Sequence, residues 1–328
     1  MGAKYRQVIA NVNGIEDILS LEVTGSSGVT RFNFVTPSSS FDINDEVVIV
    51  AGFTDGSYTL MNGGVVDTVT AERPPGLYRI EGRDKLKKAL DYFIVAASLD
   101  EADFFNPCPG VPGAYAKVSP TTAIDAILAE CGLGGVTGSA PGWELGTEED
   151  GMPLQLVSAW DAIQQICSIG AWRVWCTASG TIMFGSVLTP VGGGITLETG
   201  NEGQILSCSY SRSDENLRNK IVVIGVNGDY IGTASAVSPY VSGYKAAILS
   251  TDLLESDADC LASANANLTA FNRLTETTTV DSTGVGLELY NSVGVSEPFT
   301  GAPGGMITSI THTIDRDGYR VSLTATVV

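Results

Sequence analysis

One histidine and six cysteines are the side chains of this 328-residue sequence best suited to act as catalytic bases, nucleophiles or soft metal ligands. A hydrolase of the Ser-His-Asp or Cys-His type would have to use His312. No GxSxG nucleophile elbow and no reactive-cysteine context accompanies that histidine. We therefore interpret His312 as a structural or surface residue of a C-terminal strand.

The cysteines are scattered, without a CxxC pair or any paired spacing; they are Cys108, Cys131, Cys167, Cys176, Cys208 and Cys260. This pattern predicts unpaired thiols in a protein made in a reducing cytosol. One or two disulfides, or a metal or iron–sulfur site assembled from distant cysteines, are the alternatives that the sequence leaves open. We assign no cofactor and no metal ligand.

The acidic residues also give no recognisable site. The trio Glu148-Glu149-Asp150 could bind a cation, but it lacks the alternating ligands of a calcium loop, so we interpret it as a solvated turn. Glycines 132–135 follow a helical pattern instead of a strand, which is the wrong context for nucleotide binding. A carboxylate pair for glycoside cleavage remains open, because sequence does not give separation in space. We predict no enzyme and no catalytic residue.

The charge balance argues against a surface that holds nucleic acid. Lys and Arg number 18 against 37 Asp and Glu, a formal net charge of −19, whereas DNA-binding surfaces need basic patches. The start of the sequence has no apolar segment typical of a signal peptide. The longest apolar runs are far too short to cross a bilayer, so we expect no membrane span.

The elements that would position any site are mostly strands. Residues 1–80 read as an antiparallel β region, with a hairpin over 18–35 and turns at 55–56 and 62–64. A short amphipathic helix follows over 84–93, with Asp84 as its N-cap. Its basic cluster, Lys85, Lys87 and Lys88, is interpreted as a solvated helix face.

The middle of the chain contains the clearest local signals. Ser119-Pro120 opens a helix with proline in its favoured first position. Residues 158–185 read as one helix running into one β-hairpin, with Ser158 and Asp161 as a capping box and an alternating strand from Trp172. Three of the four tryptophans lie in or next to this segment, so we expect it to be well packed.

Strands return after residue 200. Residues 205–210 and 220–225 have strand character, and 228–250 is interpreted as a mobile Ser/Gly/Tyr-rich loop. A helix opened by Ser256 and Asp259 has an apolar stripe that we expect to be buried; its members are Leu261, Ala264, Leu268 and Phe271. A hairpin over 306–327 ends the chain. The predicted fold class is α+β, mostly β.

The order of these elements resembles a known family. The pieces that carry the resemblance are, in chain order, FDINDEV (41–47), GVVDTV (64–69), EGRD (81–84), SAWDAIQQICSIGAWRVWCTASGTIMFG (158–185), ENLRNKIVVIG (215–225), a late helix, and GMITSITHTIDRDGYRVSLTATVV (305–328). This series resembles the baseplate or tail-tip hub proteins of tailed bacteriophages, a family shared with contractile injection systems and gene transfer agents. The resemblance covers nearly the whole chain. Where many members have Pro-Gly-Asp, this chain has Ile43-Asn44-Asp45.

The resemblance implies two antiparallel β-barrel domains of the tail-tube type, 1–95 and 201–328, with an α+β region inserted at 96–200. It implies a homotrimeric ring that continues the tail tube, contacts a tube or distal tail protein, the tape measure protein and fibre or tip proteins, and passes DNA through its lumen. The implied location is the virion tail tip, assembled in the host bacterial cytoplasm. Residues 77–93 and 306–328 are the candidates for barrel closure and subunit contact, and Val321→Asp is the substitution expected to disturb the ring face.

Two other classes of function remain as alternatives. One is a β-rich module that binds a host receptor or glycan, in which Tyr230, Tyr240 and Tyr244 would be the contact residues. The other is a tail-associated cell-wall hydrolase that uses a carboxylate.

Overall fold

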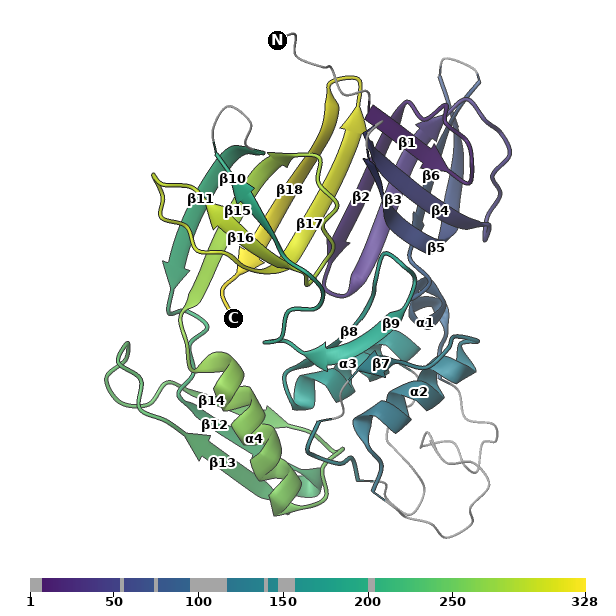
Figure 1. Cartoon of the computed structure of the whole chain (residues 1–328). Coiled ribbons are helices and arrows are strands. Elements are labelled where there is room, and N and C mark those ends of the chain that lie inside the picture. The colour runs from purple at the N-terminus through teal and green to yellow at the C-terminus, as the bar shows by residue number, and fades with distance from the viewer. Residues whose placement is uncertain are drawn as a thin grey trace.

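The computed structural model describes residues 8–53, 56–73, 76–94, 117–138, 141–146, 157–199 and 204–328. These residues form 18 strands, four α-helices and one short 3-10 helix (Figure 1). The prediction of an α+β, mostly β chain is therefore confirmed.

Twelve of the strands form one large sheet. They are β1 (Val8–Val12), β2 (Ser20–Ser26), β3 (Val29–Thr36), β4 (Glu46–Phe53), β5 (Gly56–Glu72), β6 (Leu77–Arg83), β10 (Ile195–Glu198), β11 (Ile205–Ser213), β15 (Thr275–Thr283), β16 (Ser292–Ser296), β17 (Gly305–Asp315) and β18 (Gly318–Thr326). The main path runs β1-β4-β5-β6-β3-β2-β17-β18-β15-β11, while β16 pairs with β17 and β10 pairs with β16. The antiparallel pairing of β2 with β17 joins strands from the two ends of the chain. Among the described residues no sheet closes into a barrel, because this joint makes one continuous sheet with open ends at β1 and β11.

The predicted turn at residues 62–64 is a bulge inside a long strand. Val47 pairs with Gly64 and Val48 with Asn62, so Gly63 is the extra residue. Its φ of +78° lies in the left-handed region, which glycine enters without steric cost. The strand therefore continues through the glycines where the sequence indicated a break.

Two smaller units lie below the large sheet in Figure 1. The α3 unit contains α2 (Pro120–Glu130), β7 (Thr137–Gly138), α3 (Ala159–Ile169), β8 (Trp172–Cys176) and β9 (Ile182–Ser186), with strand order β7-β9-β8. The α4 unit contains β12 (Lys220–Ile224), the 3-10 helix η1 (Val226–Gly228), β13 (Ile231–Ser235), β14 (Ala246–Ser250) and α4 (Asp257–Phe271), with strand order β13-β12-β14. In each sheet the central strand has one antiparallel and one parallel neighbour.

Helix starts follow the predicted caps. The Ser119 hydroxyl accepts the N–H of Thr122 at 3.1 Å, and Ser158 accepts the N–H of Asp161 at 3.0 Å. Each bond satisfies one of the free donors of a first helical turn. The helix predicted over 84–93 is shorter, since α1 spans Lys87–Asp91.

Of two predictions for the α4 unit, the loop over 228–250 is wrong, and the stripe of α4 is confirmed only for Ala264 and Leu268, which lie in or against the core. The segment 228–250 contains β13 and β14 in place of a continuous loop. In α4, Leu261 and Phe271 are exposed, and the buried face consists of small or polar residues, which are Asp259, Cys260, Ser263, Ala264, Asn267 and Ala270. The physical reason is close packing: a Cβ on Gly232 of β13 would lie 2.1 Å from the Cys260 carbonyl carbon, so the helix backbone almost touches the strand.

The buried apolar residues form two cores. One lies between the strands of the large sheet and includes residues from both ends of the chain. The other joins the α3 unit to the α4 unit. Strand β8 contributes to both, since Val174 belongs to the second core and Trp175 to the first.

Candidate functional site: the junction of the sheet and the α3 unit

The α3 unit attaches to the large sheet through the two faces of β8. Val174 and Cys176 pack toward α3, and Trp175 packs toward the sheet, where its ring meets Tyr290 edge-on at 5.1 Å between centroids. The alternation predicted from the sequence therefore places both faces of β8 in cores. Strand β8 therefore connects the α3 unit to the large sheet.

Arg173 fastens the same junction with polar contacts. Its guanidinium donates to the carbonyls of Val187 at 3.2 Å and Thr189 at 2.7 Å, and lies 3.8 Å from the centre of the Tyr290 ring. Burial lowers the pKa of Arg173 to about 10, so the group stays charged at neutral pH. A charged, stacked and multiply bonded arginine in this position orients the hairpin on the sheet.

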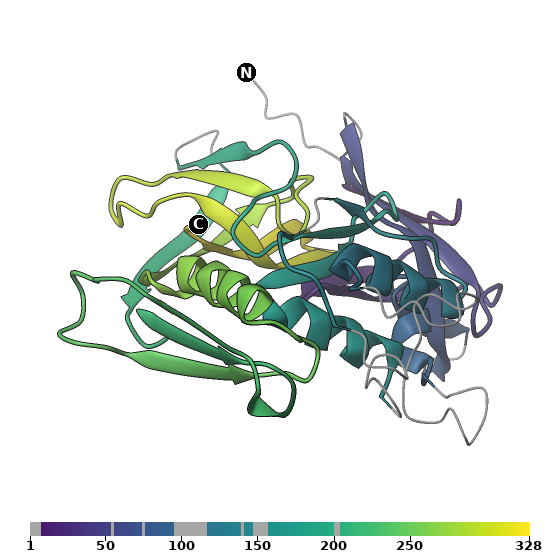
Figure 2. The same cartoon turned by 90° about the horizontal axis from the view of Figure 1, so that it is seen from below.

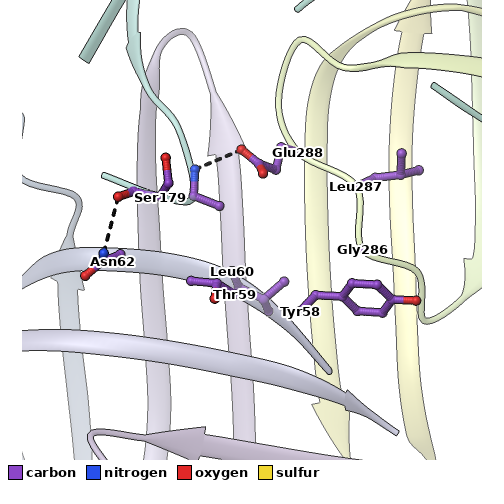
Figure 3. A pocket seen from close by; sticks show the side chains of 9 residues that line it. Tyr58, Thr59, Leu60, Asn62, Ser179, Gly286, Leu287 and Glu288 are labelled. Atoms are coloured by element: carbon purple, nitrogen blue, oxygen red, sulfur yellow. Dashed lines mark hydrogen bonds between the residues drawn. The ribbon is translucent and has the colours of Figure 1, made fainter. Parts of the chain in front are cut away.

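A cleft opens beside this junction, between β5, the turn of the β8–β9 hairpin and the segment 284–291. We call it the junction cleft; it is lined by Tyr58, Thr59, Leu60, Asn62, Ala178, Ser179, Gly286, Leu287 and Glu288. Asn62 Nδ2 donates to the Ser179 carbonyl at 3.2 Å, and the Ala178 N–H donates to Glu288 Oε2 at 2.9 Å (Figure 3). These polar groups hydrogen-bond to one another and thereby hold together the three chain segments that line the cleft.

His312 contacts the segment 284–291 that lines the cleft and is buried, which decides for the structural one of the two predicted roles. Its ring is 4% exposed, with Nδ1 2.8 Å from the Tyr319 hydroxyl and Nε2 3.0 Å from the Leu287 carbonyl. In the neutral imidazole Nε2–H donates to the Leu287 carbonyl and Nδ1 accepts from the Tyr319 hydroxyl, whose oxygen also lies 3.3 Å from the Val285 carbonyl oxygen. Burial lowers the pKa of His312 to about 4, so the imidazole is neutral and holds the segment 284–291 against the sheet. Because both ring nitrogens are hydrogen-bonded, His312 has no free lone pair with which to take a proton from a nucleophile.

The basic cluster at the start of α1 forms the predicted solvated face only in part, because Lys88 is exposed and Lys85 is half-buried, whereas Lys87 is buried. Lys87 is only 8% exposed, and its Nζ lies 3.3 Å from an Asp67 oxygen and 2.9 Å from Asn44 Oδ1. Asp67 also pairs with Arg83 at 2.8 Å. The shift of the helix start to Leu86 turns Lys87 inward, because the segment 84–86 is a turn anchored by the carboxylate of Asp84.

Asn44 explains the departure from the Pro-Gly-Asp pattern. Its φ is +70°, in the left-handed region that glycine favours and asparagine tolerates. The local geometry of the turn is therefore compatible with either residue.

Asp84 is the N-terminal anchor of this turn. Its carboxylate accepts the N–H of Thr30 at 2.6 Å and of Leu86 at 3.0 Å. Burial raises the pKa of Asp84 to about 7, and the two backbone donors oppose that shift. The predicted capping role of this residue is thus exerted on the turn that precedes α1.

The candidate contact segments lie in the middle of the large sheet. Strand β6 is paired on both sides, by β5 and β3, and β17 and β18 are paired by β2, by each other and by β15. Val321 is 1% exposed and points into the core, so the expectation that it lies on a ring face is wrong. The alternation of β18 was readable from the sequence, but which of its faces is buried depends on the strands beside it.

The remaining candidates are distributed as follows. Tyr240 and Tyr244 are exposed, whereas Tyr230 packs against the core of the α4 unit. The trio 148–150 and Cys108 lie outside the described residues.

The other five cysteines are free thiols. Among the residues placed by the structure, no cluster of three or more His, Cys, Asp or Glu could hold a metal ion. No helix within the described ranges is long and apolar enough to cross a membrane.

Searches with this sequence and structure find relatives only at the level of structure. No protein-family model matches the sequence, and no curated protein matches it. The structure is similar to a tail protein from Neisseria meningitidis MC58, with a TM-score of 0.65, 14% identity, and coverage of 98% of this chain and 96% of that chain. It is also similar to a 43 kDa tail protein of prophage MuSo2 from Shewanella oneidensis, with a TM-score of 0.61, 11% identity, and coverage of 98% and 96%.

A third similar structure is an E. coli component of the type VI secretion system, itself described as similar in structure to tail proteins of bacteriophage T4. Its TM-score is 0.57 at 12% identity, and the match covers 96% of this chain and 76% of that chain. The chain therefore has the fold of phage tail proteins over almost its whole length, as the order of its sequence elements predicted.

Proposed function

We propose that this chain is a structural subunit of a phage tail tip or baseplate, and that three copies close into a ring that continues the tail tube. The observation that carries the proposal is the open twelve-stranded sheet, in which strands from both ends of the chain are joined at β2 and β17. The tail-protein fold supports it. In this proposal the barrels expected within one chain are replaced by a barrel wall shared between copies.

Strand β11 is the edge through which the ring would close. It pairs with β15 on one side, in a register that shifts only between Ile205 and Ser207. The strand spans nine residues, contains no proline, and carries a single charged residue, Arg212. Soluble proteins normally shorten, charge or cover such an edge. A long and unprotected edge is suited to adding a strand from a neighbouring copy.

The proposed partners follow from this position in a tail. The ring would contact the tail tube or distal tail protein on one side and fibre or tip proteins on the other, with the tape measure protein in the tube. The net charge of −19 supports a lumen that DNA crosses without binding. The location would be the virion tail tip, after assembly in the host bacterial cytoplasm. The division into 1–95, 96–200 and 201–328 is part of the proposal, with the α4 unit within the third segment.

A pair of proline substitutions on β11 tests the shared wall. Successive N–H groups of an edge strand point alternately to the paired neighbour and to the open side. Of Ser209→Pro and Tyr210→Pro, one therefore removes a bond to β15 and the other removes only an outward donor. We expect the second variant to keep the wild-type circular dichroism spectrum and to lose the trimer in light scattering. If both folded variants remain trimeric, β11 does not close the ring.

A further inference from the structure

The outer face of the sheet in the α4 unit is uncovered. Along β12, Ile221 and Val223 point toward α4 and are buried, whereas Lys220, Val222 and Ile224 point the other way. Figures 1 and 2 place α4 between this sheet and the rest of the molecule, so the opposite face points outward. The described residues of the chain leave that face to solvent.

This outer face is apolar and carries no carboxylate. Ile231 on β13 is 53% exposed and Ile248 on β14 is 68% exposed, and they flank the half-buried Val222 and Ile224. The remaining outward positions of the three strands are Ala, Ser, Thr and one lysine, Lys220. In a chain with 37 acidic residues against 18 basic ones, a contiguous face without an acid is a departure from the average surface.

The α3 unit shows what covers the equivalent face within this fold. Its sheet has the same pattern of one antiparallel and one parallel neighbour and carries a helix on one face. The other face, with Arg173, Trp175 and Met183, packs against the large sheet. There the cation of Arg173 lies on the Tyr290 ring. In the α4 unit a cation on the outer face, Lys220, lies 5.3 Å from the ring of the exposed Tyr244.

We propose that a second copy of this chain docks on the outer face of β13-β12-β14, as a lateral contact between neighbouring subunits of the ring. The inference rests on the trimer of the proposed function and adds a contact distinct from the β11 edge. Charge favours a second copy as the occupant, because each copy is strongly acidic and this face offers an approach with one lysine and no like charge. The apolar rows of Val222, Ile224, Ile231 and Ile248 would be removed from water on docking.

A charge introduced at Ile248 tests this contact. Ile248→Glu places a carboxylate in the middle of β14 on this face. Leu261→Glu is the matched control, since Leu261 is 45% exposed on α4, on the other side of the same sheet. Light scattering over a dilution series gives the concentration at which the trimer dissociates. We expect that concentration to rise at least about tenfold for Ile248→Glu and to stay unchanged for Leu261→Glu. Circular dichroism confirms that each variant is folded.

A photo-crosslinker identifies the occupant in protein that carries no new charge. p-Benzoylphenylalanine at position 248, with the same residue at position 261 as the control, is irradiated in the otherwise wild-type purified protein, and crosslinked peptides are mapped by mass spectrometry. Crosslinks from 248 to a peptide of another copy support the proposal. A wild-type trimer that Ile248→Glu leaves intact, with no crosslink between copies from 248, overturns this inference while the ring stands. A wild-type chain that remains monomeric, alone and with the tail tube protein added, overturns both. Crosslinking at 248 to a different tail protein in assembled particles also overturns the inference and assigns the face to that protein.

Discussion

The α3 unit and the α4 unit have the same sheet pattern but face opposite ways. In the α3 unit the sheet lies against the large sheet, so both faces of β8 are buried and its side chains are large, with Trp175 only 2% exposed. In the α4 unit the helix lies inward, and no described residue outside the unit covers the outer face of its sheet. The arrangement in the α3 unit buries its sheet inside the subunit, whereas the arrangement in the α4 unit leaves a sheet face that another chain can contact.

The helices reflect the same difference. Helix α3 buries an apolar stripe that includes Trp160, Ile163 and Ile166. Helix α4 instead docks through polar side chains: Ser263 Oγ and Asn267 Nδ2 both donate to the Ile169 carbonyl, at 2.5 and 2.6 Å. That carbonyl belongs to the last turn of α3, whose acceptors have no partner within their own helix. The α4 unit thus caps the end of α3.

Removing Trp175 should produce the largest effect. Trp175→Ala is expected to lower the free energy of unfolding by about 3–5 kcal/mol, because it opens a cavity where the sheet and the α3 unit meet. Ile248→Ala, on the corresponding face of the α4 unit, should change it by less than about 0.5 kcal/mol. Urea unfolding at protein concentrations below assembly measures both. Equal losses of unfolding free energy in the two variants would contradict the difference in burial between the two sheet faces.

Acid should lower the free energy of unfolding through His312, which holds the segment 284–291 against the large sheet. The pKa of His312 is lowered to about 4 in the folded chain, against about 6.5 when unfolded. The contribution of the neutral imidazole to the free energy of unfolding is fully present above pH 6.5. It is lost as the pH falls toward 4, and the total loss is about 3 kcal/mol.

His312→Gln should remove this part of the pH dependence. Asp84, whose pKa is raised to about 7, acts in the opposite direction: its contribution falls as the pH rises from about 4 to 7. The difference between wild type and His312→Gln in urea unfolding from pH 4 to 7.5 isolates the histidine. A difference that does not vary with pH would contradict the neutral buried imidazole.

Replacing Arg173, on the buried face of the sheet in the α3 unit, should destabilise the chain more than replacing Lys220, on the outer face of the sheet in the α4 unit. Arg173→Met leaves the Val187 and Thr189 carbonyls without their donor and should cost about 1–3 kcal/mol of stability. Lys220→Met removes an exposed contact and should stay within about 0.5 kcal/mol. Thermal or urea unfolding of the two variants side by side decides this. A neutral Arg173→Met would mean that the guanidinium does not fasten the junction.

The smallest effect concerns the cap on α3. Ser263→Ala or Asn267→Ala alone should cost about 1 kcal/mol, because the other side chain still donates to the Ile169 carbonyl. The double variant should cost more than the sum, since that buried carbonyl then has neither donor. A double-mutant cycle measures the coupling. Strict additivity would argue against a shared acceptor.

Local features were predictable from the sequence, and long-range ones were not. The caps at Ser119 and Ser158 and the terminal hairpin depend on neighbouring residues, so their signals lie within a few positions. The buried side of α4 depends on the approach of Gly232, and the β2–β17 joint depends on strands almost 300 residues apart. A helical stripe such as Leu261 to Phe271 shows amphipathicity, but a partner strand decides which stripe is buried.

The junction was predictable only in part. The alternation of β8 marked Trp175 and Arg173 as one face, yet their partner Tyr290 carries no sequence signal. The sequence excluded a catalytic role for His312 because nothing beside it suggested a nucleophile, but it left a structural and a surface position open. Its bonds to Tyr319 and to the segment 284–291 required the fold.

The mass of the purified wild-type protein in solution tests the central claim most directly. Light scattering over a range of concentrations should give a closed species near three times the chain mass of 34.2 kDa, without larger polymers. A single monomeric species at every concentration, alone and with the tail tube protein added, would contradict a ring-forming tail subunit.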